Sequence, residues 1–368
     1  MILGMPKITF FSYFRSLQTK ARIDMKYDLY KGYLFPAFFY LTSILLPLAS
    51  SGQIDPAREI RDECTTVTAG KDATIDGSVI TSHTDDSHRT RSWMDIKAPA
   101  DHPEDAMMPM FKRVNCDTMA MPIYQHKKIG EIPQVKHTYG YINTAYPCMN
   151  QYQLAIGEST FGGRSVLQSD QGLIDCQRLC QLMLERCKTA REAIELAGEL
   201  TKDYGWIDAG ECLTIADKKE VWHFEIVGPG KGNTGSIWVA QRVPDDHVSV
   251  NANASRIMYV DPKDKDYFMV SDNIYDMALD SGWCESKEKF KFCYAYAPES
   301  RTSFAARRRE WRVFDIVAPS LKLDPNGENY PFSVKPDEKV TLEQLVTIFK
   351  DYYEGTPFNF VKDITCIL

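Results

Sequence analysis

Strand-like and helix-like segments are grouped in this sequence, and that grouping limits the possible folds more than any other feature. Asp76-Gly77 separates two β-rich runs and is a strong hairpin signal. A capping box, Thr189 with Glu192, opens one helix of a predicted pair. The expected order is strands over 65–83 and 139–160, a helix pair over 174–205, strands over 211–257, and a helix over 341–355 ending at Gly355. Grouped strands without strict βαβ alternation predict one α+β layered domain with a largely antiparallel sheet.

Charge and composition exclude some partners. The 368 residues carry a formal net charge of −7, and 44% of them are hydrophobic. The single dense basic patch, RRREWR at 307–312, is short. Binding to phosphate backbones needs a larger clustered positive surface, so nucleic acid is not an expected partner. No residue pattern calls for a cofactor, and no CxxC pair suggests a zinc knuckle.

The N-terminal stretch reads as an export signal. Tyr33–Ala49 is apolar and uncharged, follows Lys26 and Lys31, and is followed by small residues. We therefore expect a signal region over 1–51, with translation starting at Met25, and secretion or periplasmic export. A membrane anchor is the alternative, but this stretch contains two prolines and is shorter than the roughly 20 residues of a span. Contact with a membrane is then transient.

Cys64 is the candidate nucleophile. A thiol attacks acyl groups only when a base takes its proton. None of the seven histidines has a recognisable cysteine-protease setting. If the chain is cut before Cys64, the new α-amine, with a pKa of about 8, can be that base. Such a nucleophile must be Ser, Thr or Cys and must lead into a strand, as Cys64 does. The alternative is a disulfide half or an inert core thiol among ten cysteines.

Cleavage before Cys64 requires a second processing step after the export signal is removed. Signal peptidase needs small residues before its cleavage point, and Asp62-Glu63 are not small. Export would end near Ser51 or Gly52 and leave a pro-segment over 52–63. We hypothesise that Cys64 removes this segment by attacking the preceding carbonyl. The remaining domain would then span 64–368.

From Cys64 onward the chain resembles the dipeptidase A family of N-terminal-nucleophile cysteine peptidases, relatives of penicillin V acylase and bile-salt hydrolase. The resemblance implies a four-layer αββα sandwich and hydrolysis of dipeptides with free N-termini. The stretches that carry it are CTTVTAGKDATIDGSVITSHTDDS (64–87), MNQYQLAIGEST (149–160), ERCKTAREAIELAGELTKDYG (185–205), GECLTIADKKEVWHFEIVG (210–228), WVAQRVPDDHVSVNANASRI (238–257), RRREWRVFDIVAPS (307–320) and YYEGTPFNF (352–360).

The resemblance also implies roles at single positions near the nucleophile. Cys64 would be nucleophile and, through its amine, base. The acylase relatives carry an arginine where this chain has His83. The carboxylate that orients the amine would be Asp86, with Asp85 as second choice. Both acids are also compatible with a simple turn.

Three further positions are candidates in later segments. Asn253, or otherwise Asn251, would be the catalytic asparagine that donates to the oxyanion, and Asn150 is a second oxyanion candidate. Arg309 would match the last active-site arginine of the relatives. The alternatives are a strand end for Asn253 and a surface helix charge for Arg309.

Other interpretations of the whole chain remain open. HTDDSH (83–88) places two histidines and two aspartates together, which suggests a metal-dependent hydrolase, although no second cluster offers further ligands. An acylase or amidase, and an inactive exported binding protein, are the remaining alternatives. A homo-oligomer is also open. In the resembled family the stretch at 352–360 continues into more chain, so we expect a C-terminal truncation after about Phe360.

Overall fold

The computed structural model describes residues 63–86, 94–115 and 124–361, and the chain from Ile60 onward forms one compact unit. The predicted signal region and pro-segment therefore lie outside the described residues, apart from Glu63. Within the described part, no helix is both long and apolar enough to span a membrane.

The segment around Cys64 forms the centre of a five-stranded sheet. β1 (Glu63–Ala69) pairs antiparallel with β2 (Ile80–Thr81) and β3 (Thr84–Asp86), and all these pairs share one register. This confirms the predicted hairpin. On its other side β1 pairs with β15 (Val248–Asn251), which pairs with β17 (Ser333–Val334). Strands far apart in sequence thus meet beside Cys64.

A second, eight-stranded sheet lies against the first, and all its ladders between described strands are antiparallel. Its strands in spatial order are β16 (Phe268–Val270), β14 (Ile237–Arg242), β13 (Val221–Val227), β12 (Gly210–Ala216), β11 (Ala155–Gly162), β10 (Pro147–Asn150), β9 (Tyr141–Asn143) and β4 (Asp95–Lys97). All residues of β12 and β13 are buried, as expected for strands covered on both faces.

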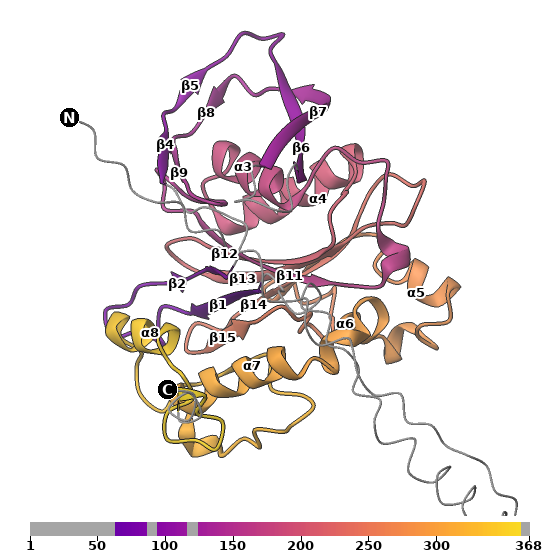
Figure 1. Cartoon of the computed structure of the whole chain (residues 1–368). Coiled ribbons are helices and arrows are strands. Elements are labelled where there is room, and N and C mark those ends of the chain that lie inside the picture. The colour runs from indigo at the N-terminus through magenta and orange to yellow at the C-terminus, as the bar shows by residue number, and fades with distance from the viewer. Residues whose placement is uncertain (1–62, 87–93, 116–123, 362–368) are drawn as a thin grey trace, which may run out of the picture. The chain divides into compact units, whose positions relative to one another are not determined.

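Two helices cover the outer face of the eight-stranded sheet. They are α3 (Cys176–Arg186) and α4 (Ala190–Tyr204), and the capping box predicted for α4 is present. Their apolar sides pack on the sheet in one core cluster that includes Leu179, Leu182 and Phe224. Figure 1 shows both helices above this sheet.

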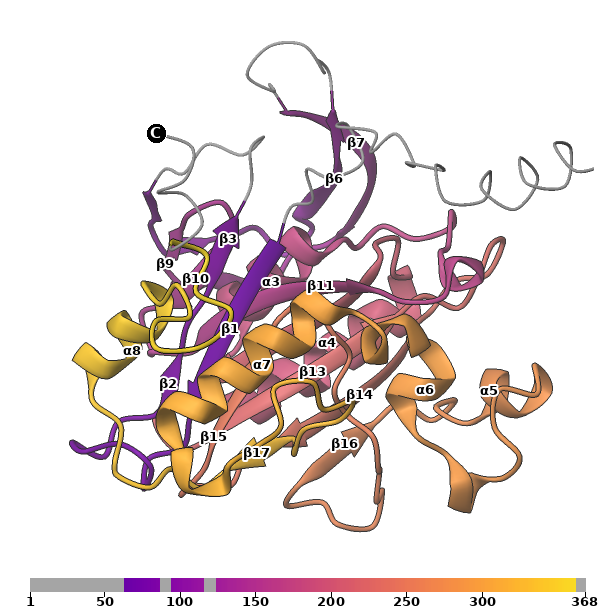
Figure 2. The same ribbon diagram turned by 60° about the horizontal axis from the view of Figure 1, so that its bottom comes forward.

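The five-stranded sheet is covered by helices from the C-terminal part of the chain. α7 (Phe304–Val317) and α8 (Leu342–Phe349) share a core cluster with β1 and β15 that contains Val67 and Val250. The layers are therefore helix, sheet, sheet and helix (Figures 1 and 2). The α+β sandwich with antiparallel sheets is confirmed.

The last helix is shorter than predicted. It ends at Phe349, whereas the sequence predicted an end at Gly355. The Asp351 carboxylate accepts from Tyr353 N at 2.8 Å and pairs with Arg312, and Tyr353 has a left-handed φ of 62°. These contacts hold the chain in a turn, so the helix cannot continue.

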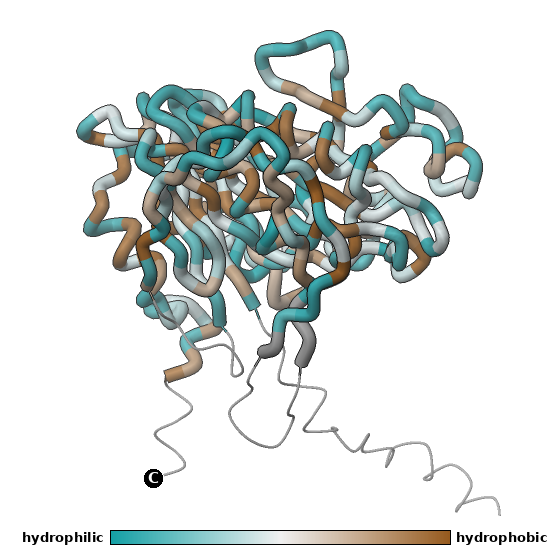
Figure 3. The backbone as a smooth tube through the Cα atoms, turned by 90° about the horizontal axis from the view of Figure 1, so that it is seen from above, coloured by the Kyte–Doolittle hydropathy of each residue, from teal (hydrophilic) through white to brown (hydrophobic). Residues whose placement is uncertain are grey.

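Shorter elements complete the described chain. The strand pairs are β5 (Ala100–Asp101) with β8 (His137–Thr138) and β6 (Met107–Asn115) with β7 (Tyr124–Pro133). The short helices are α5 (Asp276–Asp280), α6 (Phe292–Tyr296) and four 3₁₀ turns, η1 (Ser165–Leu167), η2 (Lys287–Lys289), η3 (Pro298–Arg301) and η4 (Pro319–Leu321). Hydrophobic and hydrophilic stretches are interleaved along the chain in Figure 3, as expected for elements that bury one side.

Polar residues fill part of the space between the two sheets. Thr68 Oγ1 lies 3.0 Å from His223 Nε2, and Thr81 Oγ1 lies 2.7 Å from Thr214 Oγ1. At Gly157 an added Cβ would lie 2.5 Å from the Ser82 carbonyl oxygen, so only glycine allows the sheets this close approach. The next residue of β11, Glu158, contacts Cys64 and leads to the candidate site.

Candidate active site

Cys64 is the second residue of β1, and its side chain points between the two sheets. Residues alternate along a strand, so Cys64, Thr66 and Thr68 share the face that contacts the eight-stranded sheet, whereas Val67 faces α7. The thiol is free and Cys64 is only 5% exposed. The described residues therefore do not support a disulfide at this position.

The Cys64 thiol is hydrogen-bonded to a buried carboxylate. Cys64 Sγ donates to Glu158 Oε1 at 3.2 Å, and His83 Nε2 lies 3.3 Å from the same oxygen. Glu158 comes from β11 and its side chain is 1% exposed. Sequence reasoning missed Glu158, because a glutamate inside an apolar strand has no motif around it; only its place in the matching stretch GEST pointed to it.

The backbone of Cys64 is held at both ends. Its N–H donates to Asn253 Oδ1 at 2.8 Å, and Arg309 Nη1 donates to its carbonyl oxygen at 2.7 Å. Arg309 Nη2 also donates to Asn253 Oδ1 at 3.1 Å. Three of the residues named from the sequence, Cys64, Asn253 and Arg309, are therefore brought together by β1, the end of β15 and α7.

Asn253 is itself fixed in an unusual conformation. Its φ of 56° lies in the left-handed region, which asparagine tolerates better than most residues. Its N–H donates to Ser159 Oγ at 2.8 Å and its Nδ2 donates to Thr160 O at 2.7 Å. The Oδ1 atom consequently faces the Cys64 nitrogen. The predicted oxyanion role stays a prediction, and the observed contacts position the nitrogen.

Arg309 also binds the residue before Cys64. Its Nη2 lies 2.5 Å from Glu63 Oε2. The neighbouring residue on α7, Glu310, points the other way and pairs with Arg256 and Arg301. Helix α7 thereby ties the Cys64 backbone to a buried ion network.

Electrostatics around Cys64 favour the neutral thiol. Burial first, and the negative charge of Glu158 second, raise the pKa of Cys64 well above its ordinary value. Burial and the charge of Glu158 also raise the pKa of Glu211, which accepts from Thr160 Oγ1 at 2.7 Å. A positive charge near Sγ would oppose this shift and favour the thiolate.

The two predicted acids occupy opposite faces of β3. Asp85 pairs with Cys64 in the ladder, and its charge contributes to raising the pKa of Cys64. Asp86 pairs with Glu63, is exposed, and lines a cavity of about 220 Å³ together with Arg309. Asp85, the second choice from sequence, is therefore the carboxylate on the same face as the thiol.

Asn150 and Asn251 are not brought into the Cys64 group by any contact between described residues. Asn150 Nδ2 donates to the carbonyls of Leu184 and Cys187, which closes the end of α3. Asn251 Nδ2 donates to Ala254 O at 2.7 Å. Both amides thus hold backbone turns, and the role proposed for Asn150 stays a prediction.

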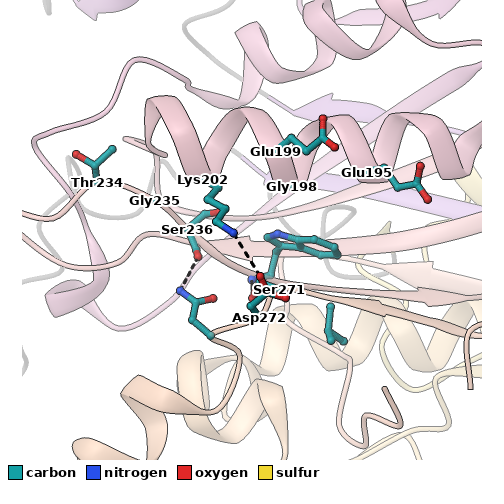
Figure 4. A pocket seen from close by; sticks show the side chains of 12 residues that line it. Glu195, Gly198, Glu199, Lys202, Thr234, Gly235, Ser236, Ser271 and Asp272 are labelled. Carbon is teal, nitrogen blue, oxygen red and sulfur yellow. Dashed lines mark hydrogen bonds and ion pairs between the residues drawn. The ribbon is translucent and has the colours of Figure 1, made fainter. Parts of the chain in front are cut away.

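A larger pocket of about 400 Å³ lies beside α4 and β14 (Figure 4). Glu195, Glu199 and Lys202 of α4 line one side, and Lys202 pairs with Asp272 across it. Cys64 and the residues in contact with it are not among its lining residues. This pocket is separate from the candidate site.

Together, the fold and the site define a class: an αββα sandwich with a buried cysteine at the start of a central strand, held by carboxylate, amide and guanidinium groups. Such a cysteine is a candidate nucleophile for acyl transfer. Comparison with known proteins gives the family. The profile of Peptidase family C69 matches residues 63–365, so the chain belongs to this family.

Curated proteins with similar sequences are named as dipeptidases. A "Probable dipeptidase" of Latilactobacillus sakei is 27% identical over 80% of this chain and 62% of its own length. "Dipeptidase A" of Lactobacillus helveticus is 20% identical over 82% of this chain and 64% of its own length. "Probable dipeptidase B" of Streptococcus pyogenes is 24% identical over 79% and 57%. The chain thus spans about three fifths of the length of these relatives.

Proposed function

We propose that this chain is a cysteine-type dipeptidase that hydrolyses dipeptides with free N-termini, with Cys64 as nucleophile after the preceding segment is removed. The observation that carries this is the pair of hydrogen bonds by which Asn253 accepts from the Cys64 nitrogen and Arg309 donates to the Cys64 carbonyl oxygen. A nucleophile that acts only through its side chain needs no such hydrogen bond at its backbone nitrogen, whereas a terminal amine that acts as base must be held in place. Family membership and the names of the relatives support peptide-bond hydrolysis.

In the proposed turnover the thiol proton passes to the α-amine, and Sγ attacks the substrate carbonyl carbon. The scissile C–N bond then breaks, the leaving amine takes the proton, and a thioester remains. Water hydrolyses the thioester, which returns the thiol and releases an acid. The amine, with a pKa of about 8, also places a positive charge beside Sγ when protonated, opposing the effect of Glu158 on the thiol pKa.

Removal of the preceding segment uses the same thiol in this proposal. Sγ adds to the Glu63 carbonyl carbon, the Glu63–Cys64 bond breaks, and the Cys64 nitrogen leaves as the free amine with a proton. Water then releases Glu63 as a carboxylic acid. The Glu63 side chain is held by Arg309, which keeps this bond fixed beside the thiol. We further propose that the chain is exported, which cell fractionation checks.

The test combines the N-terminal mass with hydrolysis of a dipeptide panel. The wild-type chain should begin at Cys64 and cleave free dipeptides. Cys64→Ala should keep the preceding residues and lose at least ~10³-fold in kcat/KM. Cys284→Ala changes a partly exposed free thiol outside the site and should match wild type in both measurements.

Two results would overturn the proposal. One is full turnover by a chain that still carries residues before Cys64, because its nitrogen would be an amide. The other is undiminished activity of Cys64→Ala. Faster hydrolysis of N-acylated amides than of free dipeptides would replace the dipeptidase with an acylase while leaving Cys64 as nucleophile.

A further inference from the structure

We propose that Cys64, His83 and Glu158 form a binding site for a thiophilic divalent cation, with Zn²⁺ as the best match. These three residues, the Cys64–His83–Glu158 group, offer a thiol sulfur, an imidazole nitrogen and a carboxylate oxygen that all lie within 4.8 Å of one another. Metal binding there does not depend on the proposed peptidase activity. The inhibition that follows from it does.

The spacing of the three atoms suits a tetrahedral ion. Sγ to Oε1 is 3.2 Å and Nε2 to Oε1 is 3.3 Å. Zinc binds sulfur at about 2.3 Å and nitrogen or oxygen at about 2.0–2.2 Å, so neighbouring ligands in a tetrahedral site lie roughly 3.3–3.6 Å apart. The two contacts to Oε1 are therefore close to tetrahedral spacing, and the third pair, Sγ and Nε2, lies within 4.8 Å. Three protein ligands also leave a fourth position for water.

Charge and protonation also suit the ion. A Cys64 thiolate and the Glu158 carboxylate together would carry two negative charges, which balance one Zn²⁺, and the His83 imidazole would add a lone pair from Nε2. The thiol proton is released to solvent when the metal binds. His83 Nε2 is buried and has no hydrogen-bond donor or acceptor in good geometry among the described residues, only its ion-pair contact with Glu158. A metal ion would give this nitrogen a partner.

The site depends on His83. Its imidazole can bind a metal ion through a ring nitrogen. An arginine at this position would always be positively charged, would have no lone pair to offer and would repel a cation.

A neighbouring group is a poorer candidate. Glu158, Cys176 and Glu211 also lie within 4.8 Å of one another, but they are 1–3% exposed. This neighbouring group contains no histidine, and all three of its side chains are almost fully closed off from solvent. His83, with 15% of its side chain exposed, gives the Cys64–His83–Glu158 group a route to solvent.

Bound zinc would hold Sγ away from any carbonyl carbon. Because one electron pair of the thiolate is then shared with the metal, Cys64 could attack neither the Glu63 carbonyl nor a substrate. Zinc would thus act as a reversible inhibitor, and a chelator would restore the thiol.

The test is a Zn²⁺ titration of the purified full chain by calorimetry, repeated with Co²⁺ to detect the thiolate-to-cobalt absorption band. We expect one ion per chain, and slower alkylation of Cys64 by iodoacetamide, read by mass spectrometry, when zinc is bound. His83→Gln and Cys64→Ser should each weaken binding at least ~10-fold. Cys176→Ser, the matched control in the neighbouring group, should bind as wild type does. Thermal unfolding checks that each variant folds.

Three outcomes would overturn the site. They are absence of saturable zinc binding to the wild-type chain, binding that survives both His83→Gln and Cys64→Ser, and loss of binding in Cys176→Ser. Binding with the expected variant pattern but no dipeptide hydrolysis would support the metal site and reject the peptidase proposal, so the two can fail separately.

Discussion

Two groups of buried charge meet near residues 252–257, and they differ in how their acids are balanced. Glu310 is fully buried and lies 3.6 Å from Arg256 Nε and 3.5 Å from Arg301 Nη2. Glu158 and Glu211 are nearly as buried, but no arginine pairs with either among the described residues. The first group is an ion network, whereas the second keeps its acids beside a thiol.

The difference separates structural from chemical use of buried acids. The arginine network fixes backbone: Arg301 Nη2 donates to Ser255 O and Arg256 Nη1 donates to Val250 O. Beside it, Glu225 accepts from Ser255 Oγ and from the N–H groups of Arg256 and Ile257. It thereby holds the segment that carries Asn253. Near Cys64, by contrast, burial first and the charge of Glu158 second raise the pKa values of Cys64 and Glu211. Strong pKa perturbation without a neutralising partner is typical of functional sites.

The largest effect should come from removing a charge in the network. Glu310→Gln leaves Arg256 and Arg301 without their shared carboxylate, and an uncompensated buried charge typically costs about 3–5 kcal/mol. We expect the free energy of unfolding, measured by urea denaturation, to fall by that amount. The control is Glu285→Gln, which removes an exposed pair with Lys289. It should cost at most ~1 kcal/mol, and equal losses in both variants would contradict the network role.

The sequence predicted the layers better than the site. Grouped strand patterns and helical spacing were sufficient for an α+β layered domain with antiparallel sheets, because each element buries one face with its own period. The four-layer sandwich itself was implied by the family resemblance. Helix α8 was overestimated because the Asp351–Arg312 contact that ends the turn joins residues far apart in sequence. Glu158 was missed for the same reason: its role arises only when β11 packs against β1.

A smaller effect is expected at Asn253, which lies between the two groups. Asn253→Ala removes three side-chain hydrogen bonds and leaves a left-handed φ to alanine. We expect a loss of about 2–3 kcal/mol in the free energy of unfolding, with Asn253→Gly about 1 kcal/mol more stable than Asn253→Ala.

The matched control for Asn253 is Gln153, which is exposed and has a left-handed φ of 68°. Gln153→Ala and Gln153→Gly report the backbone cost alone. If the alanine variants at both positions lose equal stability, the Asn253 side chain contributes nothing to the free energy of unfolding, and its hydrogen bond with the Cys64 nitrogen does not stabilise the fold.

The smallest effect, and the sharpest contrast with Glu310, is expected for the same substitution at Glu211. Burial raises the pKa of Glu211 and so favours its protonated form in the folded chain, to which glutamine is close to an isostere; Glu211→Gln should therefore change stability at pH 5 by at most ~1 kcal/mol. The unfolded chain ionises this group above its ordinary pKa of 4.5, and the raised pKa moves ionisation in the folded chain to higher pH. The stabilisation that this group gives the wild-type chain is therefore full below pH 4.5 and is lost as the pH rises toward the folded-state pKa, with a slope of up to about 1.4 kcal/mol per pH unit.

Glutamine removes that loss. The free energy of unfolding of the variant, measured in urea, should therefore rise relative to that of wild type between pH 5 and pH 8. A variant that instead loses stability relative to wild type as the pH rises would mean that Glu211 is ionised in the folded chain and that the two groups of acids are balanced alike.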